Sequence, residues 1–404
     1  MKNQDLYYID FAARIKKIQG EMAKEGLDVY LGSRLRTLSW TLDAFCPWRS
    51  YIVIQREGMP TAFTFVIDAA RVADDTWLDE DNVRGYAPMG GQDQITQIAD
   101  YIIEDLLAGK GRIGYETGLS NYLPEGNLTQ YEYEAFKAAL PEATFINAHY
   151  IVDQLSLIKD EGTINRFREA SRQVDVGHKA VYEALIDGGF KKLTETVVAG
   201  IAALAMRQEG SEWEWSFTGG NEIASGYRTG YTGGACTPPG RRKLKAGEPL
   251  MVDLHAMFML GLGDHSVNYL LSPVSDRQWW HANNFVDIVR KTLDTYRAGI
   301  SPSKLAAEML SYADDNGFAD YMVPGFEHGI GMMGDEWRIG KHDGPMPYWT
   351  DPFHIYQENE MLICAMQYAC AEDEIGFRYE APIVIKENGI ELLPKHPLEI
   401  IEIK

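Results

Sequence analysis

Hydrophobic and polar positions in the first 150 residues follow two alternating periods. Over residues 8–25, apolar side chains from Ile9 to Met22 recur at three- and four-residue spacing, which predicts an amphipathic helix. Residues 94–109 show the same period and end at a glycine, which predicts a second helix. Between and after these helices, short β-rich runs bounded by Gly, Pro or charge predict strands at 27–33, 49–55, 61–68 and 112–116. Strands that alternate with helices predict an α/β layer structure.

A second pattern begins near residue 155. Residues 156–189 predict a long helix in which Asp160 is a candidate cap. A Gly- and Pro-rich stretch, 219–242, is either a functional loop or a disordered insert. The remaining patterns predict helices at 193–210, 277–297 and 302–316, an apolar β-like run at 249–272 and further strands in the C-terminal third. We therefore predict two domains, 1–155 and 156–404.

Charge and targeting patterns narrow the class of protein. The 404 residues carry 59 acidic against 38 basic side chains, a formal net charge of −21. DNA, RNA and anionic lipid need a basic footprint, so this excess of acid argues against all three and leaves a small-molecule substrate or a metal ion. No CxxC pair, leader-like apolar segment or membrane-length apolar stretch stands out, which predicts a soluble cytoplasmic protein.

Four ionisable side chains lie in apolar surroundings, where surface decoration does not explain them. They are Asp253, Asp264, His328 and Glu380. Buried carboxylates need a partner, and a metal ion or a catalytic role supplies one. Ion pairs with arginine are the alternative. Three carboxylates and one imidazole suit a divalent ion such as Mn, Fe, Co or Zn.

The order of these residues resembles that of a known family. An Asp, a second Asp eleven residues later, the sequence HGIG and a Glu within GxRxE are similar to the creatinase/aminopeptidase family, peptidase M24. That family includes Xaa-Pro dipeptidase, creatinase and a DMSP lyase. The resemblance implies a pita-bread catalytic domain behind a smaller creatinase-like α/β domain, and a homodimer. It also implies that Asp253, Asp264, His328 and Glu380 are metal ligands.

The chain departs from the family pattern at the fifth ligand. The family carries a Glu fourteen residues before the position of Glu380, and Met366 stands there. A thioether is a poor ligand for ions that carboxylates select. The resemblance therefore implies an incomplete site with one divalent ion rather than a two-metal clamp, and His255 or Gln367 as a substitute ligand.

Two family histidines are also absent. Asp335 stands where the peptidases carry a second His, and residues 233–237 contain none. Asp335 is therefore a candidate general base, provided that burial or the neighbouring acid Glu336 raises its pKa, and Glu336 and His328 are further candidate catalytic residues. The alternative is that Asp335 and Glu336 cap a surface turn.

Aromatic and arginine side chains near these motifs predict a wall around a cationic or zwitterionic substrate. The candidate substrate-binding residues are Trp48, Arg49, Trp213, Tyr227, Arg228 and Trp337. Core packing of the aromatics and ion pairs between the arginines and the chain's own acids are the alternatives.

The leading prediction is a hydrolase that cleaves a C–N bond in a small zwitterionic or dipeptide-like substrate. A lyase with Asp335 as its base is a second hypothesis, because the run Asp335 to Trp337 and the string Ala224 to Thr229 are similar to the DMSP lyase. A metal-free binding protein is a third, motivated by Met366.

Overall fold

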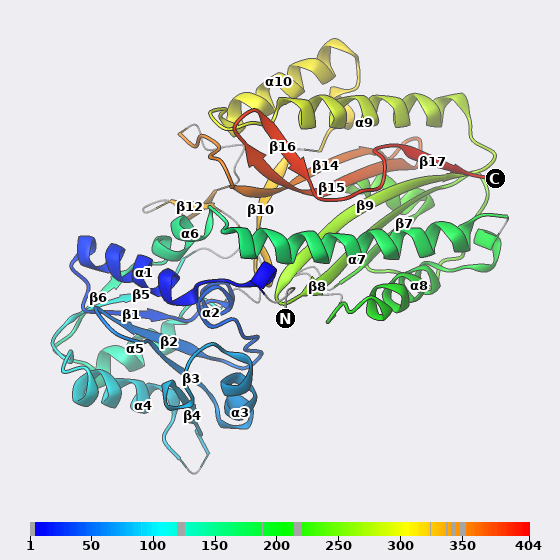
Figure 1. The fold of residues 1–404 in the computed structure, drawn as a ribbon. Coiled ribbons are helices and arrows are strands. Elements are labelled where there is room, and N and C mark those ends of the chain that lie inside the picture. The colour runs from blue at the N-terminus through cyan, green and yellow to red at the C-terminus, as the bar shows by residue number, and fades with distance from the viewer. Residues whose placement is uncertain are drawn as a thin grey trace.

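The computed structural model describes most of the chain and shows two lobes (Figure 1). The described residues are 5–89, 91–118, 126–187, 189–213, 220–323, 325–336, 338–340, 344–346 and 353–404. The predicted two-domain α/β architecture is confirmed. The predicted boundary at residue 155 stays a prediction; it falls inside α6, one residue before that helix ends.

The N-terminal lobe is a six-stranded mixed sheet with the order β4-β3-β2-β1-β5-β6. Its strands are β1 (Val29–Gly32), β2 (Tyr51–Gln55), β3 (Thr61–Phe65), β4 (Val83–Tyr86), β5 (Arg112–Tyr115) and β6 (Thr144–Asn147). Its helices are α1 (Phe11–Glu25), α2 (Leu35–Leu42), α3 (Val66–Asp75), α4 (Gln94–Asp100), α5 (Gln130–Ala139) and α6 (Tyr150–Ser156). The strand predicted over 61–68 ends at Phe65, because α3 begins at the next residue.

Helix α1 shows how local sequence sets the ends of an element. Asp10 accepts a hydrogen bond from the amide of Ala13, and Gly26 ends the helix in the left-handed conformation. The apolar face is buried as its spacing predicts, with Ile15, Ile18 and Met22 in one core cluster of the lobe.

The C-terminal lobe contains two larger sheets. One has the order β17-β9-β8-β7 and the other β11-β10-β14-β15-β16. The first consists of β7 (Glu222–Ser225), β8 (Pro249–Phe258), β9 (Gly261–Leu271) and β17 (Ile400–Ile403). The second consists of β10 (Glu327–Gly331), β11 (Gly334–Glu336), β14 (Met361–Cys370), β15 (Ile375–Lys386) and β16 (Gly389–Leu392). A further strand pair joins β12 (Arg338–Gly340) to β13 (Gly344–Met346).

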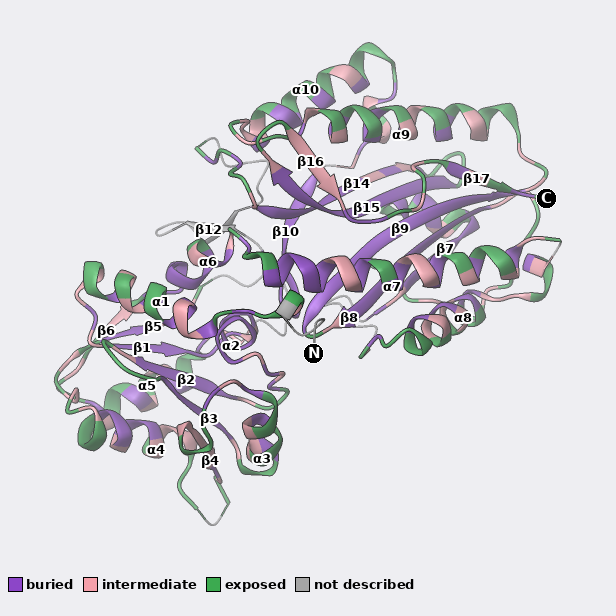
Figure 2. Cartoon of the chain, viewed as in Figure 1, coloured by how far each residue is buried: buried purple, intermediate pink, exposed green. Residues whose placement is uncertain are grey.

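Helices cover the outer faces of these two sheets (Figure 1). They are α7 (Glu161–Leu185), α8 (Glu195–Gln208), α9 (Asp276–Thr295) and α10 (Pro302–Asp315). Figure 2 shows the long central strands buried along almost their whole length. One core cluster joins α7 and α8 to β8 and β9, and another joins α9 and α10 to β14 and β15. The strand faces turned away from these cores carry the polar residues of the candidate site.

The two lobes are joined by buried or partly buried ion pairs. Asp160 caps α7 through the amide of Thr163, as predicted, and its carboxylate also lies 2.7 Å from Arg14 of α1. Arg166 of α7 lies 2.5 Å from Asp43, which follows α2. Both contacts connect the start of α7 to the N-terminal lobe and so hold that lobe against the C-terminal lobe.

Candidate active site

The four predicted ligands come together between the two large sheets. Asp253 and His255 lie on β8, and Asp264 lies opposite His255 in the β8–β9 register. Successive side chains of a strand point to opposite faces, so these residues share the face turned away from α7. Glu380 of β15 belongs to the facing sheet, and its amide donates to the Ser266 hydroxyl of β9 at 2.7 Å. The polar residues of two sheets therefore meet in one buried layer.

Arg378 lies in the middle of this layer. It precedes Glu380 by two residues on β15, so both side chains emerge from one face. Its guanidinium lies 2.5 Å from Glu380 and 3.1 Å from Asp253, and it also donates to Glu222 of β7. Glu222 is the register partner of Asp253. One fixed cation is thus shared among three buried carboxylates.

His255 provides a second cationic group. Its Nε2 lies 3.2 Å from Asp264 Oδ1, and both side chains are about 3% exposed. Burial lowers the pKa of His255, but the carboxylate of Asp264 outweighs it and raises that pKa to about 10. For Asp264 burial itself raises the pKa, and the nearby Glu380 raises it further.

The other end of the layer contains His328, Asp335 and Glu380. His328 of β10 lies 3.7 Å from Asp335 through Nδ1 and 3.7 Å from Glu380 through Nε2. Burial lowers the pKa of His328, but Asp335 and Glu380 outweigh it and raise the value to about 10. Burial raises the pKa of Asp335 to about 7, against the opposing effect of His328. Asp335 is 7% exposed, so it does not cap a surface turn.

The donor set fits a divalent ion. Two groups of candidate ligand atoms, each with all atoms within 4.8 Å of one another, share Asp264. The groups are Asp253, His255, Asp264 and Glu380, and Asp264, His328 and Asp335. Asp253 Oδ2 and Asp264 Oδ1 face Arg378 and His255 at 3.1 and 3.2 Å. Asp253 Oδ1 is buried without a hydrogen-bond partner among the described residues. Such a buried carboxylate oxygen is costly, and a bound cation would satisfy it.

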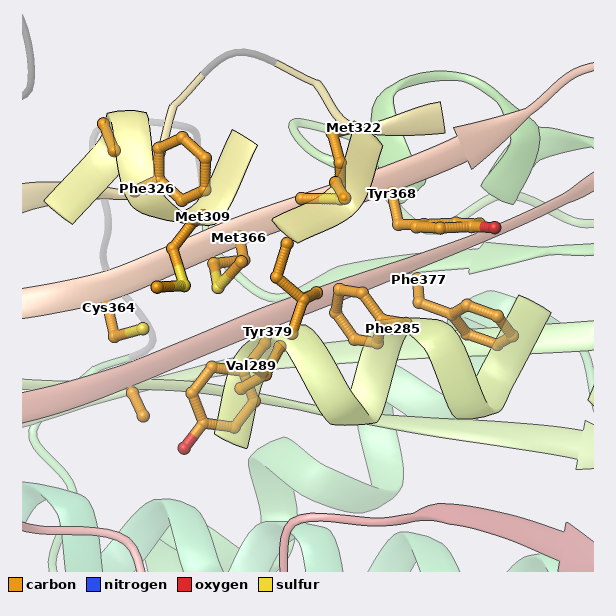
Figure 3. Packing of buried hydrophobic residues seen from close by; sticks show 14 of the residues in the cluster. Phe285, Val289, Met309, Met322, Phe326, Cys364, Met366, Tyr368, Phe377 and Tyr379 are labelled. Atoms are coloured by element: carbon orange, nitrogen blue, oxygen red, sulfur yellow. The ribbon is translucent and has the colours of Figure 1, made fainter. Parts of the chain in front are cut away.

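The structure corrects the position assigned to the missing ligand. Met366 pairs with Tyr379, and both point into the core beneath α9, beside Val289 and Met309 (Figure 3). The residue opposite Glu380 is Ala365, fifteen positions earlier. The family spacing of fourteen residues before Glu380 leads to Met366 on β14. Side chains alternate along a strand, so Met366 lies on the opposite face from Ala365 and from the site. The carboxylate is still absent, since Ala365 has no donor atom.

Glu336 does not join the cluster. It follows Asp335 on β11 and so points to the other face, where its carboxylate lies 2.7 Å from buried Lys159. Gly331 of the HGIG motif gives it room, because a Cβ there would lie 2.0 Å from Glu336 Oε1. The predicted catalytic role of Glu336 is therefore corrected to an ion pair that ties β11 to the start of α7.

Arg49 and Arg228 are engaged by the chain's own acids. Arg49 lies 2.7 Å from Glu132 inside the N-terminal lobe. Arg228 donates to buried Glu195 of α8 and to the Pro238 carbonyl. Their predicted pairing with a substrate carboxylate is corrected: both guanidinium groups hold local structure.

Among the residues that the structure describes, the predicted aromatic wall is not assembled around the cluster. Trp48 is half exposed and packs on Phe65, while Trp213 packs edge-on against Phe45. Tyr227 lies at the surface beside Tyr231. Trp213 and Phe45 do line a pocket where the two lobes meet. Trp337 lies outside the described residues.

Sequence reasoning missed two members of the site. Arg378 had a readable signal, because the R and the E of GxRxE are two apart in a β-like run and so share a face. Glu222 had none, because only the antiparallel register of β7 with β8 brings it beside Asp253.

Comparison with protein families now identifies the class. Residues 165–387 match the model for metallopeptidase family M24, and residues 14–158 match the creatinase/prolidase N-terminal domain. The first match covers more than half of the chain. The chain therefore belongs to metallopeptidase family M24, which confirms the resemblance seen in its motifs.

Curated relatives are distant. The chain is 26% identical to ectoine hydrolase of Halomonas elongata over 187 residues, 44% of this chain and 45% of that enzyme. It is 22% identical to the Xaa-Pro dipeptidase of Pyrococcus furiosus over 278 residues, 69% of this chain and 74% of that enzyme. The first alignment thus spans less than half of the relative it matches.

Solved structures agree with the fold. An Xaa-Pro dipeptidase from Bacillus anthracis matches with a TM-score of 0.78 and 18% identity over 97% of this chain and all of that one. The prolidase from Pyrococcus horikoshii OT3 matches with a TM-score of 0.75 and 18% identity over 95% of this chain and 99% of that one. These matches confirm the predicted pita-bread lobe and the creatinase-like N-terminal lobe of the same chain.

None of the helices in the described residues is long and apolar enough to cross a bilayer.

Proposed function

We propose that this chain is a hydrolase that cleaves a C–N bond in a small zwitterionic or dipeptide-like substrate. The buried layer of Asp264, His328, Asp335 and Glu380, within the residues that match family M24, carries the proposal. The names of the two curated relatives favour hydrolysis over the lyase and over a binding role.

We assign one divalent ion, Mn, Fe, Co or Zn, to Asp264, His328 and Glu380. Arg378 already supplies a positive charge beside Asp253, so a second ion there would meet a fixed guanidinium. Such an ion, when bound, polarises a substrate carbonyl and activates water. Asp253 was among the predicted ligands and in this proposal serves as an ion-pair partner instead.

The remaining work falls to the chain's own side chains. Asp335 lies beside His328 with its carboxylate inside the buried layer, where it can accept a proton from attacking water. His328 Nδ1 donates to the Gly329 carbonyl at 3.0 Å, which fixes the ring with Nε2 toward Glu380. Arg378 and His255 hold Glu380, Asp253 and Asp264 in place.

Incubation of purified protein with Xaa-Pro dipeptides, creatine and ectoine, with and without added Mn²⁺, tests the proposal. Chromatographic detection of the free amine or amino acid should show turnover of at least one substrate. Asp335→Asn is the inactive comparison, and Asp105→Asn, at an exposed ion pair with Arg84, is the active one. Absence of turnover for every C–N substrate, with or without metal, would contradict the proposed hydrolase activity.

The cytoplasmic location and the homodimer stay predictions.

A further inference from the structure

A cluster of three histidines lies on the opposite side of the β8–β9 sheet from the candidate active site. His265 follows Asp264 on β9, so it points the other way, toward α7. His178 of α7 and His396 of the segment between β16 and β17 lie against it. Asp175, one turn before His178 on α7, completes the group.

The rings of His265 and His396 have the spacing of ligands around one ion. Their centroids lie 4.9 Å apart, and two imidazoles bound to a tetrahedral ion at about 2.0–2.1 Å have their centres about 5 Å apart. Nitrogen atoms of His265 and His396 and an oxygen of Asp175 lie within 4.8 Å of one another. The ring of His178 packs against both rings, but its nitrogen atoms do not belong to that group.

Hydrogen bonds leave two ring nitrogens available. His265 Nε2 donates to the Ser171 carbonyl at 3.1 Å, and His178 Nε2 donates to the His265 carbonyl at 2.8 Å. A carbonyl oxygen only accepts, so in each neutral ring the proton is on Nε2 and Nδ1 carries a lone pair. Both Nδ1 atoms are buried and have no hydrogen-bond partner in the described part of the chain; His265 is 0% exposed and His178 is 3% exposed. A metal-bound histidine is held in this way, by a carbonyl on its other nitrogen.

Asp175 orients the third ring. Its carboxylate accepts from His396 Nδ1 at 3.0 Å and from the Lys395 amide at 3.0 Å. The ring of His396 and Asp175 are each 17% exposed, and a surface pocket lined by Arg172, Asp175 and Lys395 opens beside them. An ion therefore has an entry route to otherwise buried ligands.

We propose that His265, His396 and Asp175 form a second metal site, with His178 packed against it, that is selective for a borderline transition-metal ion of the Zn²⁺ class. Imidazole donors suit Zn, Co, Ni and Cu, whereas the carboxylate-rich candidate active site suits harder ions. The ion would join α7, β9 and the segment before β17. Its role is structural, because the site lies behind the sheet and away from the catalytic layer.

Cobalt binding to the full chain tests this site separately from the active site. Three proteins are compared after treatment with a chelator: the wild type, His396→Ala and Lys395→Ala. Each is loaded with Co²⁺ and freed of excess ion, and its bound cobalt and visible absorption are then measured. Lys395→Ala is the matched control, because that exposed side chain neighbours the site and only its backbone amide contacts Asp175. His396→Ala should bind one Co²⁺ fewer per chain than both others and lose the intense absorption of tetrahedral cobalt.

A second measurement keeps the proposal open to refutation if His396→Ala folds poorly. In a Glu380→Gln background, which lacks a ligand of the active-site ion, added Zn²⁺ should raise the melting temperature, and the further change Asp175→Asn or His396→Gln should abolish that rise. Equal cobalt content in wild type and His396→Ala, or equal Zn²⁺ stabilisation of Glu380→Gln with and without His396→Gln, would overturn the second site.

Discussion

The Arg378 guanidinium lies 3.1 Å from Asp253 Oδ2, inside a layer of carboxylates that the family pattern assigns to metal. The same group contacts Glu380 at 2.5 Å. Because burial of a carboxylate without a cation is costly, this one arginine supplies much of the charge balance of the site. Pairing with Arg378 also explains how Asp253 and Glu380, both predicted as metal ligands, can be buried.

Replacement of Arg378 should therefore create a need for metal. Arg378→Gln leaves Asp253, Glu222 and Glu380 without their shared cation, and removal of one partner of a buried pair costs about 3–5 kcal/mol. Millimolar Mn²⁺ should recover part of that loss, which urea unfolding with and without Mn²⁺ measures. Arg277→Gln, at a half-exposed pair with Asp373, is the control. Equal Mn²⁺ effects in the two variants would contradict this account.

Asp335 should affect turnover more than folding. Asp335→Asn keeps the shape of the side chain but removes its ability to take a proton, so kcat should fall by about 10²-fold or more. KM should change little if Asp335 acts mainly on the proton. Steady-state kinetics test this on whichever substrate the turnover assay identifies, and circular dichroism is the folding control. A kcat within about threefold of wild type would remove Asp335 from the mechanism.

The strand register predicts opposite outcomes for two neighbouring substitutions. Met366→Glu places a carboxylate in the apolar core beneath α9, so the protein should lose several kcal/mol of stability or fail to fold. Ala365→Glu places a carboxylate opposite Glu380, where it should raise Mn²⁺ affinity. Equilibrium dialysis and thermal melts compare the two. Tighter Mn²⁺ binding by Met366→Glu than by Ala365→Glu would show that the register is wrong.

Asp153 gives the N-terminal lobe a pH-dependent stability. It is buried and pairs with Arg34 at 2.9 Å and Arg36 at 2.5 Å. Burial raises its pKa, but Arg34 and then Arg36 outweigh this and lower it below the ordinary value. A carboxyl with a lowered folded-state pKa stabilises the protein above its unfolded pKa of about 3.9, and this contribution is lost as pH falls through the folded value.

Asp153→Asn should consequently be destabilised by about 3–5 kcal/mol at pH 7. The difference from wild type should start to shrink below about pH 4, where Asp153 of the unfolded chain takes up a proton, and should shrink until the pH has fallen through the lower folded-state pKa. Urea unfolding at several pH values follows the difference. Asp28→Asn, at a largely exposed pair with Arg56, should show only a small effect at any pH. A difference that stays constant down to pH 2 would refute the assignment.

Most residues of the site were predicted from the sequence, and those that were misplaced or missed have physical explanations. Asp253, Asp264, His328 and Glu380 were found because charged groups inside apolar runs must be paired. Met366 was misplaced because the register pairs Glu380 with Ala365, and a shift of one residue along a strand reverses the face of the side chain. Glu222 was missed because strand pairing across a long separation leaves no local pattern.

Periodicity and motif spacing are local properties of the chain, so they were enough to predict the α/β architecture, the family and the residues able to take part in chemistry. Which charges meet one another depends on the tertiary structure. It placed Arg378 among the acids and turned Glu336 toward Lys159. It also gathered His178, His265 and His396 from three distant segments. Such contacts depend on register and on the packing of one sheet against another, which no single stretch of sequence encodes.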